Sequence, residues 1–243
     1  MSQTNAHGQP VGAPVTQSFP RPWPPRAAMT GRTCTVVPAD PKAHAGALFR
    51  AYAADAGGRG WTYMPYGPFR TLPEFQGWMR TICAGDDPMF SVILDATGAP
   101  VGLAAYLRIK PDAGVIEVGH IHFSPRLQGT VAATEAMYLM MRQVFEELGY
   151  RRYEWKCDAL NAGSRRAAER LGFRFEGVFR QATHYKGRNR DTAWYAVIDG
   201  EWPVLRAGFE AWLAAGNFDG AGRQRNRLHT RLRGARAAHP IEE

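Results

Sequence analysis

A phosphate-binding arrangement is the clearest chemical feature of this sequence, and it spans Glu117 to Ala136. Alternating apolar residues over 114–123 predict a strand, and a short turn containing Gly129 leads directly into a predicted helix. The first turn of a helix has N–H groups without intrahelical partners and carries partial positive charge, so it can hold a pyrophosphate without a lysine. No lysine occurs between Glu117 and Arg151, and the segment contains neither GxxxxGK[ST] nor GxGxxG. The segment therefore predicts phosphate binding by main-chain amides, although a purely structural turn would have the same pattern.

A second motif runs from Asn161 to Gly177 and reads NAGSRRAAERLGFRFEG. With this motif, the chain resembles the GNAT superfamily of acetyl-CoA-dependent N-acetyltransferases. In that family the cofactor loop reads Gln/Arg-x-x-Gly-x-Gly/Ala. The matching residues here are Gln128, Gly129, Thr130, Val131, Ala132 and Ala133. The resemblance implies that they bind acetyl-CoA, and Val131, which replaces the central glycine, leaves the amides available if it is helical.

Two further segments, Thr134–Ala136 and Lys186–Tyr195, resemble the ribosomal-protein alanine acetyltransferase-like branch of the superfamily. The resemblance covers about residues 34–215. It implies an α/β (α+β) fold: a single domain with a central mixed, mostly antiparallel sheet flanked by helices. It also implies that the strand bearing Glu117 and a parallel strand bearing Glu154 lie side by side and splay apart to admit the pantetheine arm.

Hydrophobic periodicity predicts the elements that would position these motifs. Strands are predicted over 35–37, 89–95, 100–109, 114–123, 152–158, 173–183 and 192–199, and helices over 42–54, 72–83, 128–148, 164–171 and 203–213. The aromatic-rich loop 61–69 is either a small hydrophobic cluster or a wall of the acceptor site. Residues 1–33 form a Pro/Gly-rich tail that we expect to be disordered or extended, residues 34–219 form the domain, and residues 220–243 form a flexible Arg-rich tail.

Transfer of an acetyl group from a thioester to an amine requires a base, hydrogen-bond donors and an acid. Glu117 matches the strand glutamate that deprotonates the amine in several GNAT enzymes, although it could instead be a structural ion-pair partner. His120 and His122 are the other polar residues of this strand. His122, a second catalytic candidate, would face the opposite side of the sheet from Glu117 unless a bulge intervenes. The resemblance also implies that main-chain groups of Ile121, His122 and Phe123 contact the thioester and the pantetheine arm.

The proton donor is less evident, because Ala168 stands where the family often has a tyrosine. Ser164 could donate a proton to the departing sulfur, or it could simply cap the helix that follows. Asn161 resembles the residue that binds the pantetheine amides, or it forms a turn. Thr183 occupies a position where the branch can have an acid, and His184 is beside it.

Composition limits the other classes of function. The net charge is +8, but residues 1–33 contribute +3 and residues 221–243 contribute +4, so residues 34–220 carry only +1. A nucleic-acid-binding face would place that charge on the folded domain. The three cysteines fit no zinc spacing and favour a reducing compartment, and no apolar run is long enough for a membrane span. We therefore expect a cytoplasmic protein, a monomer or homodimer, with no metal and no membrane partner.

The sequence thus predicts an N-acetyltransferase that transfers the acetyl group of acetyl-CoA to a primary amine by direct attack in a ternary complex. The acceptor is a protein N-terminus or a small amine. Val131 and Ala168 leave open a CoA-binding regulator that has lost catalysis. The arginine-rich tails leave open a nucleic-acid-associated protein.

Overall fold

The computed structural model describes residues 3–228 and is built around one eight-stranded sheet of order β3-β4-β5-β6-β7-β8-β10-β9. The strands are β3 (Met29–Thr30), β4 (Cys34–Pro38), β5 (Met89–Asp95), β6 (Pro100–Lys110), β7 (Val115–Phe123), β8 (Arg152–Asp158), β9 (Arg174–Tyr185) and β10 (Arg188–Ile198). Only β7 and β8 pair in parallel, and all other neighbours are antiparallel. This arrangement confirms the predicted mixed, mostly antiparallel sheet. A separate small hairpin joins β1 (Gln3–Thr4) and β2 (Pro10–Val11).

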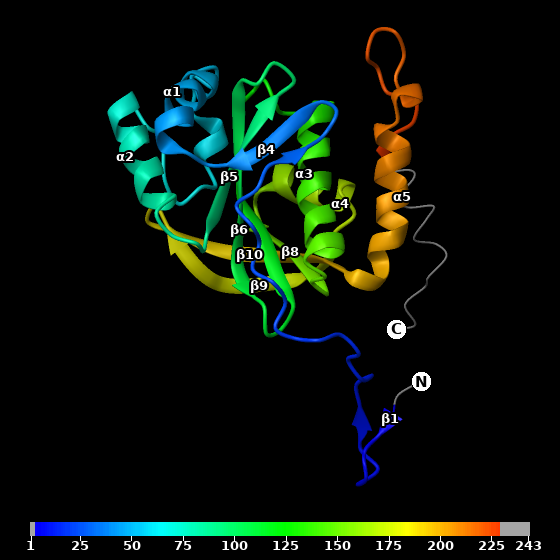
Figure 1. Ribbon diagram of the computed structural model, residues 1–243. Coiled ribbons are helices and arrows are strands. Elements are labelled where there is room, and N and C mark those ends of the chain that lie inside the picture. The colour runs from blue at the N-terminus through cyan, green and yellow to red at the C-terminus, as the bar shows by residue number, and fades with distance from the viewer. Residues whose placement is uncertain (1–2, 229–243) are drawn as a thin grey trace.

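Helices cover both faces of the sheet (Figure 1). They are α1 (Pro41–Tyr52), α2 (Leu72–Ile82), α3 (Val131–Arg142), α4 (Ala162–Arg170) and α5 (Trp202–Leu213), with short 3-10 turns at Arg59–Trp61, Asp199–Glu201 and Ala215–Asn217. Helices α1 and α2 lie on one face, and α3 and α5 lie on the other. Two hydrophobic cores follow from this layering, a smaller one beneath α1 and α2 and a larger one beneath α3 and α5.

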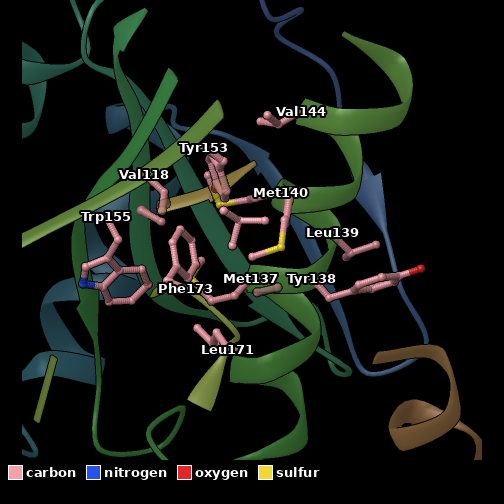
Figure 2. Packing of buried hydrophobic residues seen from close by; sticks show 14 of the residues in the cluster. Val118, Met137, Tyr138, Leu139, Met140, Val144, Tyr153, Trp155, Leu171 and Phe173 are labelled. Atoms are coloured by element: carbon pink, nitrogen blue, oxygen red, sulfur yellow. The ribbon is translucent and has the colours of Figure 1, made fainter. Parts of the chain in front are cut away.

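Helix α3 fixes the larger core and the start of the phosphate-binding turn. Its side chains Met137 and Met140, with Val144 of the following turn, point toward Val118 and Tyr153 of the sheet (Figure 2). These residues are nearly all inaccessible to solvent, and burial of each side chain of this size contributes about 1.5–3 kcal/mol.

The predicted helix over 128–148 is shorter and divided. It begins at Val131, because the Thr130 hydroxyl accepts from the Ala133 N–H and caps the helix. At Gln143–Glu147 the hydrogen bonding changes to a π-helical turn. A wider turn of this kind lets the chain leave the sheet face without a proline or a mid-helix glycine.

The capping of α4 also differs from the prediction. Asn161, rather than Ser164, is the N-cap residue, and its Oδ1 accepts from the Ser164 N–H at 3.0 Å. Ser164 therefore lies within the first turn of α4. Its hydroxyl is not used to cap the helix and projects toward Trp155.

The parallel strands separate as the resemblance implies. Pairing between β7 and β8 runs from Val115↔Arg152 to Val118↔Trp155 and includes Glu117↔Glu154. Both strands continue past that point, to Phe123 and Asp158, without pairing to each other. The sheet is therefore open between the ends of two adjacent strands.

The N-terminal segment packs on the domain before residue 34. Met29 is 6% exposed and pairs with Val36, so the sheet begins at β3. The buried Glu135 carboxylate accepts from the N–H groups of Arg32 and Thr33 at 2.8 and 2.5 Å, which fixes the turn between β3 and β4. Further upstream the chain is extended, as Figure 1 shows in blue.

The C-terminal segment also packs further than residue 219, since Leu228 is 1% exposed and belongs to the larger core. The remainder of the predicted Arg-rich tail, residues 229–243, lies outside the described residues. Within residues 3–228 none of the helices is long and apolar enough to cross a lipid bilayer.

Candidate active site

Two cavities flank the opening between β7 and β8. The larger, which we call the helix-end cavity, has a volume of about 660 Å³ and lies at the N-terminal ends of α3 and α4. It is lined by Arg59, Gly60, Tyr63, Ile121, His122, Phe123, Gln128, Gly129, Thr130, Ala133, Thr134, Met137, Trp155, Asn161, Gly163, Ser164, Ala167, Arg170, Leu171 and Gln224. Nine of the eleven residues expected to bind the cofactor are in this set, and the other two, Val131 and Ala132, are not.

The smaller cavity, which we call the hairpin cavity, has a volume of about 280 Å³ and lies beside the β9–β10 hairpin. It is lined by Tyr63, Met64, Pro65, Leu107, Arg108, Glu117, Val118, Gly119, His120, Ile121, Trp155, Lys156, Cys157, Asp158, Asn161, Ser164, Thr183, His184, Tyr185 and Arg190. The residues that line both cavities are Tyr63, Ile121, Trp155, Asn161 and Ser164. They surround the opening where the two strands separate, so the cavities meet through the sheet.

The start of α3 offers main-chain donors to the helix-end cavity. Among the described residues, the N–H groups of Gly129, Val131 and Ala132 donate to no protein acceptor. The Thr130 N–H is used, because it donates to the Leu127 carbonyl at 3.2 Å, and the Ala133 N–H is bound to the Thr130 hydroxyl. Gly129 has φ +74°, a conformation that favours glycine and that turns the chain into the helix. Three free amides at a helix start form a site for an anion such as a pyrophosphate.

The end of β7 lines the helix-end cavity, but two of its three carbonyls already have a protein donor. The His122 carbonyl accepts from the Tyr52 hydroxyl at 2.9 Å, and the Phe123 carbonyl accepts from the Gln128 side chain at 2.8 Å. Gln128 therefore fixes the turn through its side chain. Any contact with a pantetheine arm here would depend on N–H groups and on Ile121 more than on these two carbonyls.

The Ser164 hydroxyl lies at the opening between the cavities. Its Oγ accepts from the Trp155 indole N–H at 2.9 Å, so its own hydrogen points elsewhere. The Cys157 thiol is close: burial raises its pKa, and a hydrogen bond from Ser164 opposes that rise. The Ser164 hydroxyl is therefore placed to donate a hydrogen bond to the Cys157 thiol or to a thiolate bound at the opening.

Glu117 lies in the hairpin cavity at the centre of an ion-pair network. It is 2% exposed, with Oε1 2.7 Å from Arg108 Nη1 and Oε2 2.9 Å from Lys156 Nζ. Lys156 also lies 2.8 Å from Glu154 and 3.7 Å from the centre of the Trp194 ring. Burial raises the pKa of Glu117, and the two cations only partly offset that effect. Glu117 is therefore both an ion-pair partner and a carboxylate of increased basicity.

A β-bulge decides where His122 lies. Across β6 and β7, Leu103 pairs with His122 but Ala105 pairs with Gly119, so β7 has one extra residue at His120–Ile121. His120 accordingly has φ +49°. The extra residue places His122 on the same face of the sheet as Glu117. Simple alternation of side chains would have placed it on the opposite face.

His122 nevertheless lines the other cavity. Its ring stacks on Trp61 with centroids 3.7 Å apart and meets Tyr52 edge-on, and neither ring nitrogen has a hydrogen-bond partner within residues 3–228. Burial lowers the pKa of His122 to about 4, so the ring is neutral at physiological pH. The structure does not bring His122 together with Glu117 in one cavity.

Residues 35–174 match the family model of the acetyltransferase (GNAT) domain. The chain belongs to the GNAT family of acetyltransferases. Its activity is therefore acyl transfer, and GNAT enzymes use acetyl-CoA as cosubstrate.

Related GNAT proteins cover most of the chain. A crystal structure of a GCN5-related N-acetyltransferase from Brucella melitensis is 44% identical, with a TM-score of 0.88 over 90% of this chain and 100% of that one. A probable acetyltransferase from Chromobacterium violaceum is 39% identical, with a TM-score of 0.75 over 80% of this chain and 98% of that one. The uncharacterized N-acetyltransferase YnaD of Bacillus subtilis is 25% identical over 140 residues, which are 58% of this chain and 81% of YnaD.

The finer resemblance to the ribosomal-protein branch is not confirmed. RimL, the ribosomal L7/L12 alpha-N-protein acetyltransferase, is 19% identical, with a TM-score of 0.61 over 71% of this chain and 94% of RimL. Similarity at that level shows the GNAT fold alone. Glu135 lies in the Thr134–Ala136 segment that suggested this branch, and its carboxylate accepts the hydrogen bonds that fix the turn between β3 and β4.

Several charged residues of the cavity lining were not predicted from the sequence. Lys156, Arg108 and Arg190 line the hairpin cavity. The alternation of Glu154 and Lys156 along one strand was a usable signal, because residues two apart share a face. In the loop 61–69, Trp61 and Phe69 pack in the smaller core, as one of the two predictions for this loop had it, and Tyr63 lines both cavities.

Proposed function

We propose that this GNAT protein is an N-acetyltransferase that uses acetyl-CoA and a primary amine in one ternary complex. The observation that carries the proposal is the pair of cavities that meet at the opening between β7 and β8. One cavity has free helix-start amides for a pyrophosphate, and the other has a buried carboxylate. This separation would let the two substrates bind in different cavities and meet at the opening.

The amides of Gly129, Val131 and Ala132 are the groups that would hold the CoA pyrophosphate, and Asn161 and Ser164 would flank the arm at the opening. When bound, acetyl-CoA supplies a thioester whose acetyl group is passed to the amine, releasing CoA as the free thiol. A new C–N bond forms at the carbonyl carbon as the C–S bond breaks. Two protons must move: one leaves the amine nitrogen, and one reaches the sulfur.

Glu117 is the group that would take the proton from the amine. It lines the hairpin cavity, it is nearly buried, and burial raises its pKa toward the working range of a general base. Ser164 is the group that would donate to the sulfur, because its Oγ accepts from the Trp155 indole N–H and its own hydrogen is left to donate at the opening. Ala168 is fully buried within α4 and contributes no acid.

The test is acetyl transfer itself. Calorimetry should show one CoA site per chain, and incubation with labelled acetyl-CoA and a panel of primary amines should give an N-acetylated product and free thiol in equal amounts. Absence of CoA binding at millimolar concentration would refute the proposal. CoA binding without transfer to any amine would instead indicate the regulatory protein considered above.

A further inference from the structure

The cations of the hairpin cavity are not all neutralised by its acids. Three cationic side chains line the cavity, Arg108, Lys156 and Arg190, against two carboxylates, Glu117 and Asp158. Arg108 and Lys156 are both ion-paired to Glu117, and Lys156 is also paired to a second glutamate. The excess positive charge therefore belongs to Arg190.

Arg190 has no ion pair within residues 3–228. Its Nε donates to the Thr192 hydroxyl at 3.2 Å, and its guanidinium lies 5.8 Å from the centre of the Tyr185 ring. Asp158, the second carboxylate of the lining, accepts instead from the Tyr185 hydroxyl at 2.7 Å and from the Leu160 N–H at 2.8 Å. Both terminal nitrogens of Arg190 are thus left to donate, and a guanidinium of this kind suits a carboxylate or phosphate.

The charge of Arg190 acts inside the cavity. Burial, together with Arg108 and Arg190, lowers the pKa of His120 to about 4, while Asp87 opposes this shift. His120 is therefore neutral and also hydrogen-bonded to the Tyr66 hydroxyl at 2.8 Å. The only free cation in the described part of the cavity lining is the guanidinium of Arg190.

Two hydrogen bonds connect the loop 61–69 to the segments around the hairpin cavity. The Lys186 ammonium, in the β9–β10 turn, donates to the Trp61 carbonyl at 2.7 Å, and the Tyr63 hydroxyl donates to the Leu160 carbonyl at 3.1 Å. These two bonds connect the loop 61–69 to the hairpin and to the loop before α4. A volume of about 280 Å³ is just below the usual range for small-molecule sites. A polypeptide N-terminus would need a longer groove for the rest of its chain.

We propose that the acceptor is a small primary amine carrying its own carboxylate or phosphate, which pairs with Arg190 while the amino group faces Glu117. This inference rests on the proposed acetyl transfer and names the acceptor class of the same site. Arg190 is the specificity-determining residue. Its role is to anchor the part of the acceptor that does not react.

The experiment compares matched acceptors with acetyl-CoA and the full chain. L-amino acids are compared with their amides, and 2-aminoethyl phosphate is compared with 2-aminoethanol, each at equal concentration of neutral amine. Wild type should prefer the anionic member of at least one pair by tenfold or more in kcat/KM, and which pair responds distinguishes carboxylate from phosphate. Arg190→Gln should remove that preference by raising KM for the anionic amine. Kinetics with the uncharged amine should stay within a few-fold.

Two further variants keep the test decisive. Arg190→Lys should retain part of the preference, which a purely structural effect would not explain. Arg188→Gln, an exposed position on β10 that does not line the cavity, should leave it unchanged. Equal use of charged and uncharged amines by the wild type, or equal loss for both in Arg190→Gln, would overturn the inference while leaving acetyl transfer intact. Acetylation of a peptide N-terminus without any small anionic amine would also overturn it.

Discussion

Glu117 combines the contacts of an ion-pair partner with the burial and raised pKa that the proposed base would need. Its two oxygens contact Arg108 and Lys156, an arrangement that by itself would indicate an ion pair. Yet burial raises its pKa despite these cations, and the side chain lines the cavity where an amine would bind. Glu154 offers a comparison, because it contacts the same lysine but does not line that cavity.

Glu117→Gln should lower kcat by about 10²–10⁴-fold at neutral pH, because it removes the base but keeps the shape. A base acts only when ionised, so wild-type kcat/KM should fall as pH drops through the raised pKa of Glu117, and the variant should lack this dependence. Affinity for CoA should change by no more than a few-fold. Glu154→Gln is the matched control and should retain most activity. Equal losses in the two variants would show that Glu117 acts by holding Lys156.

Ser164 and Asn161 lie close together at the start of α4, so variants of the two residues can test the proposed proton donor and the helix cap separately. Ser164→Ala should lower kcat by about 10²-fold, since it removes one hydrogen-bond donor to the developing thiolate. Asn161→Ala should instead destabilise the protein by about 0.5–2 kcal/mol, because it removes the cap of α4. Steady-state kinetics and thermal unfolding of both variants check this. An unchanged kcat in Ser164→Ala would exclude Ser164 as the proton donor.

At the scale of elements, the strand–turn–helix unit of β7 and α3 makes most of the proposed cofactor site. The turn leaves three amides free because Thr130 caps the helix with its hydroxyl and Gly129 adopts positive φ. Val131 is compatible with this geometry, since a residue at the first helical position contributes its amide whatever its side chain. The bulge in β7 then sets which side chains face each cavity.

Gly129→Ala tests the turn, with Gly98→Ala as its control. Both glycines have positive φ, +74° and +80°, and open space where a Cβ would lie. Each substitution should therefore lower the free energy of unfolding by a similar amount, about 1–2 kcal/mol, because alanine is strained in the left-handed backbone conformation. Only Gly129→Ala should weaken CoA binding, by roughly tenfold or about 1.4 kcal/mol, because the strained turn moves the amides. Calorimetry that gives equal CoA affinities for the two variants would place the pyrophosphate elsewhere.

At the scale of the whole molecule, the N-terminal segment is part of the folded unit. Arg21 donates its backbone N–H to the Pro111 carbonyl at 3.0 Å, Arg26 pairs with Asp86 at 2.9 Å, and Met29 enters the larger core. The segment thus crosses several strands of the sheet before β4 begins (Figure 1). Part of the positive charge of residues 1–33 is used in contacts with the domain.

Met29→Ala should therefore destabilise the protein by about 2–5 kcal/mol, as expected for a buried methionine truncated in a core. Val15→Ala, at a position that is 52% exposed, should change stability by less than about 0.5 kcal/mol. Chemical denaturation of both variants measures the difference. If the two variants were equally stable, the segment before β4 would not be packed in solution.

The sequence by itself determined the features that depend on neighbouring residues. Periodicity located the strands and helices of the domain, because side chains that share a buried face recur at fixed spacing. The free amides at the start of α3 were also predictable, because such amides arise wherever a helix begins after a turn. The cap of α4 was misassigned, since Asn161 and Ser164 are both capable of capping and only the backbone geometry selects between them.

Only the tertiary structure decided which distant residues share a cavity. Glu117, Lys156 and Arg190 come from three strands, and their meeting depends on strand order and on the register of β7 with β8. The bulge at His120–Ile121 reversed the side that simple alternation assigns to His122, and the hydrogen bonds of Lys186 and Tyr63 join segments remote in sequence. The physical reason is that register and loop closure are set by packing across the whole sheet, which no local pattern records.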